Sequence, residues 1–236
     1  MNKLSITQAE ELSYKLRNMA GFSDKEPINM KTFIMKLGIL LLYKPMGSNS
    51  CGMSLMSADR QYKFILINSK NPKGRQHFTI GHELYHLYYD EKPEPHVCKL
   101  YEQNKNISEY NADIFSSALL MPQKSIIENI PDTEIIKKDI SMATLLKLQH
   151  LFSVSFQALV IRLKHLKMIT ENQLQQFLGL PITDIAKEYG YNTSLYKRGN
   201  ENLMIGNFGE KAKILFDKEK ISEGHYTELL NMINNE

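Results

Sequence analysis

The sequence predicts an α+β fold that is mainly helical, with a small antiparallel sheet near its start and a helical extension at its carboxyl end. Three observations lead to this prediction. Apolar residues recur at helical spacing through most of the 236 residues. Between residues 39 and 68 the period changes to short apolar or alternating runs, which are typical of strands. After residue 75 the helical spacing returns and continues almost to the end of the chain.

The first predicted elements are two helices and three strands. An amphipathic helix covers residues 7–19 and stops at Gly21, and a shorter helix over about residues 29–37 ends at Gly38. The strands that follow are separated by turn-forming residues, and they are ILLLY at 39–43, CGMSLMS at 51–57 and YKFILIN at 62–68. Helices are expected next at 75–89, 108–121, 123–130, twice within 141–168, and around 210–218 and 225–233.

Composition narrows the class of protein. With 42% hydrophobic and 23% charged residues the chain is an ordinary globular sequence, and a net charge of +3 is too small to indicate nucleic-acid binding. We see no amino-terminal signal and no apolar run that could span a membrane, so we expect a cytoplasmic protein. Cys51 and Cys98 fit a reducing compartment, and neither a thiolate zinc site nor metal binding by His96 with Cys98 is expected.

The stretch RQHFTIGHELYHLYYD, residues 75–90, has two histidines four residues apart with a glutamate directly after the first. On a helix this spacing lets the imidazole rings of His82 and His86 converge on one zinc ion. Glu83 is offset from the pair and could act as a general base on a water. The alternative is a polar face on an exposed helix. The apolar stripe, which must be buried, lies on roughly the opposite side, at Ile80, Leu84, Leu87 and Tyr88.

A catalytic zinc needs a third protein ligand, and the next helix offers one. The stretch SEYNADIFSSALLMP, residues 108–122, places Glu109 and Asp113 four apart on one face. We expect Glu109 to be the third ligand and Asp113 to accept the free ring N–H of a ligand histidine. Asn111 points elsewhere on this helix. Taken alone, two acids on a helix would indicate a solvated face, so this expectation depends on the histidine motif.

Two details of the expected site stay open. An oxyanion needs a further donor, and Tyr85, Tyr88, His77 and His150 are all candidates. An extended substrate could add as a strand along the edge of the sheet, which here would be residues 51–57 or 62–68.

These motifs resemble those of the ImmA/IrrE family of intracellular metallopeptidases. The resemblance rests on RQHFTIGHELYHL and EYNADIFSSALLMP, and more weakly on LQHLFSVSFQALVIRLKHLKMI, so that it covers about residues 50–169. It implies a zincin-like fold in which one Zn²⁺ is held by His82, His86 and Glu109, with Glu83 as the base. One departure is Asn111, where the family often has a second glutamate.

The resemblance also implies a function. The best-known members lie beside a helix-turn-helix repressor, in mobile elements or stress responses, and relieve repression by causing its cleavage. A zinc-dependent endopeptidase acting on such a repressor is therefore expected. The rival hypothesis is a non-proteolytic regulator, or a toxin-neutralising binding module, with a structural metal site and contacts to DNA or a repressor.

Three parts of the chain are predicted: a zincin-like metallopeptidase domain over residues 1–135, a helix-turn-helix-like segment over 136–170 and a helical extension over 171–236. Between Lys137 and Lys167 there are six basic residues and one acidic residue, Asp139. This segment could pack on the metal-site helices, bind a partner protein, or bind DNA through residues such as Arg162 and Lys164. Packing is favoured. The role of residues 179–236 is left open between closing the core and docking a partner.

Overall fold

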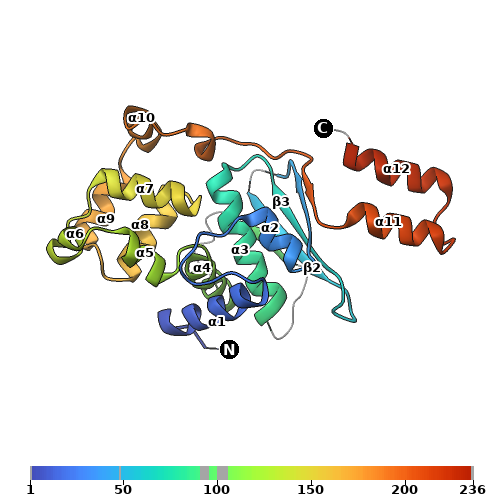
Figure 1. The fold of residues 1–236 in the computed structure, drawn as a ribbon, viewed down its shortest axis with the longest axis horizontal. Coiled ribbons are helices and arrows are strands. Elements are labelled where there is room, and N and C mark those ends of the chain that lie inside the picture. Colours follow the sequence, from blue (N-terminus) through green and yellow to red (C-terminus); the bar gives the residue numbers. More distant parts are fainter. Residues whose placement is uncertain (1, 48, 91–95, 100–105, 235–236) are drawn as a thin grey trace.

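The computed structural model describes residues 2–47, 49–90, 96–99 and 106–234 (Figure 1). A small sheet lies against a central helix, and further helices cover that helix from the other side. The predicted class, a mainly helical α+β fold with helices at its carboxyl end, is confirmed. The helical extension ends in a pair of helices beside the sheet, well apart from the other helices in this view.

The sheet has five strands in the order β4-β2-β3-β1-β5. Their bounds are Leu40–Lys44 for β1, Ser50–Met56 for β2, Lys63–Asn68 for β3, His96–Lys99 for β4 and Met204–Ile205 for β5. Neighbouring strands are antiparallel except β1 and β3, which are parallel. The prediction of an antiparallel sheet is wrong at this pair. In the sheet, β3 lies between β2 and β1. β2 runs antiparallel to β3, whereas β1, on the other side of β3, runs in the same direction as β3.

This order also changes which strands lie at the edges. β2 and β3 are both internal, so the expectation that a substrate could add along residues 51–57 or 62–68 is wrong. The edges are β4 and β5, two short strands that the sequence pattern did not indicate. β5 comes from far along the chain and pairs with β1 through Ile205 and Met204.

The helices that were predicted are present, and their bounds lie close to the expected ones. They are α1 Ile6–Met19, α2 Met30–Lys36, α3 Lys73–Tyr89, α4 Ile107–Leu120, α5 Gln123–Asn129, α6 Asp132–Lys137, α7 Met142–Phe152, α8 Phe156–His165, α9 Glu171–Leu178, α10 Ile182–Glu188, α11 Phe208–Asp217 and α12 Glu223–Asn234. A 3₁₀ turn, η1, covers Thr193–Tyr196. Short α6, α9 and α10 were not predicted. Side-chain caps begin several helices, at Ser5, Asn29, Asn106, Ser141, Ser155 and Thr170.

Helix α3 lies between the sheet and helix α4 and is buried on nearly all sides from Thr79 to Leu87. Two glycines allow its neighbours to come close. A Cβ on Gly81 would overlap Ser116 Oγ of α4, and a Cβ on Gly52 of β2 would lie 2.8 Å from Thr79 Cγ2. The polar side of α3 therefore faces protein, and its charged residues need partners there.

Helices α7 and α8 meet at 107° across a three-residue turn, which is helix-turn-helix geometry. Half of the residues of α8 are nevertheless buried, and they pack in the core that includes Phe152, Val154, Leu159 and Leu163. Arg162, which was named under the less favoured alternative of DNA binding, is not available to DNA. Its side chain is fully buried, where it forms an ion pair with Glu10 of α1 and donates from Nε to the Met121 carbonyl at 3.2 Å.

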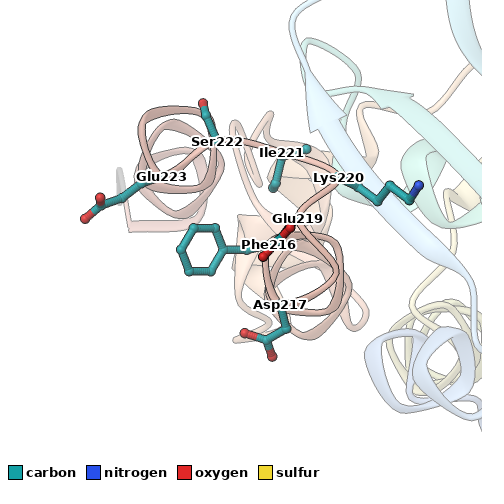
Figure 2. Close-up of a pocket in the computed structure, with 7 residues that line it drawn as sticks. All are labelled: Phe216, Asp217, Glu219, Lys220, Ile221, Ser222 and Glu223. Atoms are coloured by element: carbon teal, nitrogen blue, oxygen red, sulfur yellow. The ribbon is translucent and has the colours of Figure 1, made fainter.

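The carboxyl-terminal part is joined to the sheet layer by an extended segment. Lys73 N at the start of α3 donates to the Lys197 carbonyl at 3.0 Å, and Gln76 Nε2 donates to the Gly199 carbonyl at 3.0 Å. Beyond β5, α11 and α12 pack against each other, with the rings of Phe216 and Tyr226 stacked at 4.8 Å. Figure 2 shows the shallow pocket at the turn between them. The division of the chain at residues 135 and 170 stays a prediction.

Within the described ranges, no single helix is long and apolar enough to cross a membrane; α7 and α8 reach that length only as a bent pair.

Candidate metal centre

Helices α3 and α4 bring three possible ligand atoms together in the core. His82 Nε2 lies 3.1 Å from His86 Nε2, and these two nitrogens lie 3.3 Å from Glu109 Oε2 and Oε1 respectively. All three side chains are buried, and they form a group that could hold a metal ion. The Asn106 cap, which accepts from Glu109 N at 2.9 Å, starts α4 one turn before this contact.

The other nitrogen of each imidazole lies against a carboxylate. His82 Nδ1 is 2.9 Å from Asp113 Oδ1, and His86 Nδ1 is 2.6 Å from Asp90 Oδ2. A neutral imidazole that donates from Nδ1 to a carboxylate carries its lone pair on Nε2. The two Nε2 atoms then face each other as acceptors at 3.1 Å, a contact that is favourable only with a cation or a proton between them.

The charges of the cluster favour a cation. Burial alone would lower the pKa of His82, but hydrogen bonds with Asp113 and Glu109 raise it to about 10. At His86 burial also acts to lower the pKa, but hydrogen bonds with Asp90 and Glu109 raise it above its usual value. Burial would raise the pKa of the Glu109 carboxyl, yet its contacts with both histidines hold it well below the usual range. Because a metal ion must displace these protons, metal binding should release protons.

Glu83 is completely buried beside this group, and the described residues hold only one of its oxygens. Its Oε2 accepts a hydrogen bond of 2.7 Å from Ser54 Oγ on strand β2. Among the described residues its Oε1 has no hydrogen-bond partner, although a buried carboxylate oxygen is costly to leave unpaired. A water or substrate group at a metal centre would satisfy this oxygen.

Two of these contacts were not predicted. Asp90 lies four residues after His86, the same spacing that indicated Asp113 from Glu109, so the spacing alone could have identified it. Asp90 also accepts a hydrogen bond of 2.7 Å from Ser108 Oγ at the start of α4. No local pattern indicates Ser54, because only the packing of β2 on α3 brings it to Glu83.

Asn111 is not part of the ligand group. It is fully buried, accepts from Leu4 N at 2.7 Å and donates to the Asn2 carbonyl at 3.0 Å, so it ties the amino terminus to α4. The possible Cys98 and His96 pair cannot be assessed, because those side chains lie outside the described part of the structure.

The four oxyanion candidates are in different surroundings. His77 Nδ1 contacts the Ser153 carbonyl at 2.8 Å, and the ring of His150 stacks on Tyr191 with ring centroids 4.4 Å apart. The ring of Tyr88 lies under Lys63 Nζ at 5.1 Å. The ring of Tyr85 lies against a histidine of the ligand group, with its centroid 5.8 Å from that of the His86 ring.

The fold and this cluster define a protein that can hold a metal ion between two packed helices beside a small sheet. The sequence profile of the IrrE N-terminal-like domain, the M78 peptidase family, matches residues 34–164. Because this match spans more than half of the chain, the protein belongs to that family, and the predicted resemblance is confirmed. Among curated proteins, none matches the chain.

Replacing Asp90 with alanine is expected to weaken metal-ion binding about 10–100-fold, the usual effect of removing a carboxylate that orients a ligand histidine. The reason is that the His86 ring would lose the acceptor that sets its orientation and tautomer. Competition with a chromophoric chelator measures the affinity. Asp59→Ala removes an exposed aspartate from the loop after β2 and serves as the control. Equal affinities for the two variants would show that Asp90 does not orient a ligand.

Proposed function

We propose that this protein is a zinc-dependent endopeptidase that acts in the cytoplasm and cleaves a helix-turn-helix repressor. The observation that carries the proposal is the group of His82, His86 and Glu109 with Glu83 beside it. Membership of the M78 family supports peptidase activity. The repressor as substrate rests on the family resemblance alone.

The ligand group fits zinc in its dimensions and in its chemistry. Tetrahedral zinc with ligands at about 2.0–2.1 Å has ligand atoms about 3.3 Å apart. The three distances within the group are 3.1, 3.3 and 3.3 Å. Two imidazoles and one carboxylate, with a fourth position left for water or substrate, form a ligand set of catalytic zinc.

When bound, zinc would acidify a water molecule and polarise the peptide carbonyl. The residues of the chain have separate parts in the reaction. Glu83 takes a proton from the attacking water at Oε1 and returns it to the leaving amine. Asp113 and Asp90 hold the rings of His82 and His86 so that both Nε2 atoms point to the same place. Burial of the cluster keeps bulk water from competing for these contacts.

The direct test is to incubate the zinc-loaded protein with the repressor encoded by a neighbouring gene and to identify products by mass spectrometry. One defined cleavage, absent from a Glu83→Gln sample that carries the same amount of zinc, is the expected result. If the repressor stays intact but an unfolded protein such as casein is cut, the repressor is not the substrate. If neither is cut by a fully zinc-loaded protein, the proposal of an endopeptidase is wrong.

The rival function, DNA binding without proteolysis, has less support from the described residues. The second helix of a helix-turn-helix reads DNA through exposed side chains, but α8 buries five of its ten residues, Arg162 included. Salt-dependent DNA affinity that falls on Lys164→Ala would favour the rival.

A further inference from the structure

We propose that Ser54 is a positioning residue that fixes the orientation of Glu83 for the reaction. The inference deepens the proposed function and rests on it. Ser54 Oγ donates to Glu83 Oε2 at 2.7 Å, and both side chains are buried. The contact joins strand β2 to helix α3, 29 residues apart in the sequence. It leaves Glu83 Oε1 as the oxygen that is available for chemistry.

The backbone of Ser54 is held firmly in place. Ser54 lies within β2 and is paired with Ile65 of β3 on one side and with His96 of β4 on the other. Two residues earlier, Gly52 lets the strand approach α3, because a larger side chain there would meet Thr79 Cγ2 and the Leu66 carbonyl. Residues two apart in a strand share a face of the sheet, so Gly52 and Ser54 both face α3. The close approach at Gly52 thus brings the Ser54 hydroxyl within reach of Glu83.

The carboxylate of a glutamate needs such a contact to keep a single orientation. The last torsion of its side chain is broad, with no strongly preferred angle, so an unrestrained carboxylate would sample many orientations. Helix α3 sets the position of the Glu83 backbone but not the angle of its carboxylate. The Ser54 hydroxyl supplies that restraint at Oε2, and the proton transfers of the reaction are left to Oε1. Ser54 itself keeps its proton and forms no bond to the substrate.

The first measurement is a double-mutant cycle on casein cleavage with zinc-loaded proteins. Ser54→Ala should lower kcat about tenfold with KM and zinc content unchanged, the pattern of a lost transition-state interaction. In the Glu83→Gln background the same change should have no further effect on residual activity, since Ser54 acts through Glu83. Ser54→Thr, which keeps the hydroxyl, should restore most of kcat. Ser125→Ala, which removes a buried serine that donates to the Lys25 carbonyl, is the control for a lost hydroxyl.

The second measurement does not need a substrate. Acetohydroxamic acid chelates zinc and gives up a proton that a neighbouring base accepts, so its affinity reports the orientation of Glu83. By calorimetry, Ser54→Ala should bind it about fivefold to tenfold more weakly, with unchanged zinc affinity, and Glu83→Gln should show at least the same loss.

The two measurements separate failure of the inference from failure of the proposed function. Equal hydroxamate affinity in the wild type and Ser54→Ala would overturn the role of Ser54, whatever is found for cleavage. The role of Ser54 would also be overturned if Ser54→Ala lowered kcat equally in the Glu83→Gln background, because a general loss of structure would lower the activity of both backgrounds. A wild type that binds zinc but cuts neither casein nor repressor, while its hydroxamate affinity depends on Ser54, would contradict the endopeptidase proposal and leave the positioning role intact.

Discussion

Glu83→Gln is expected to lower kcat about 10²–10⁴-fold, the range that a general base contributes, and to leave the zinc content unchanged. Glutamine has the same shape and can still accept the Ser54 hydrogen bond at one end of its side chain. At the other end it presents an amide that donates and cannot take a proton. Because Glu83 is fully buried, the neutral side chain should also fold without loss of stability.

The measurement pairs kcat on casein with zinc content by atomic absorption for each protein. Glu11→Gln, on the exposed face of α1, is the matched control and should behave as the wild type. Activity of Glu83→Gln within threefold of the wild type, at full zinc occupancy, would remove Glu83 from the mechanism.

The second large effect concerns stability. Glu10→Ala is expected to reduce the free energy of unfolding by about 3 kcal/mol, because it leaves the charge of Arg162 buried without its partner. Burial already lowers the pKa of Arg162 to about 10, which shows how strongly its charged form is disfavoured there. For a chain of this size, such a change lowers Tm by roughly 6–12 °C.

Adjacent Glu11 again provides the control, since Glu11→Ala removes an exposed carboxylate from the same helix and should change Tm little. A second comparison is the double variant Glu10→Leu with Arg162→Met, which replaces both charges by apolar groups and should recover most of the loss. Equal denaturation midpoints for Glu10→Ala and Glu11→Ala would show that the ion pair does not stabilise the fold.

Local patterns were enough for much of the fold. Helical spacing located α1, α3 and α4, and the capping residues Ser5 and Asn106 account for the agreement at the starts of α1 and α4. The motif spacing indicated His82, His86 and Glu109, since a helix converts separations of four residues into neighbours on one face. The structure brings these three side chains together in the core.

Other features could not be predicted because no local pattern carries them. The parallel pairing of β1 with β3 depends on which side of β3 each strand takes, and β5 pairs with β1 from about 160 residues further along the chain, beyond the reach of any periodicity. A helical wheel separates apolar from polar faces, but it cannot tell a polar face that meets water from one that meets protein. The sequence therefore left open whether Arg162 meets water, DNA or protein, and the structure places it in the core.

By itself, the sequence determined the kind of chemistry: two histidines and a glutamate within one helical turn, with a second acidic helix to complete a metal site. Only the tertiary structure decided how those groups are held. Ser54 on Glu83 and Glu10 on Arg162 are contacts of buried polar groups with residues far away in the sequence. A buried polar group must find its partner wherever packing places one, and packing depends on the whole chain.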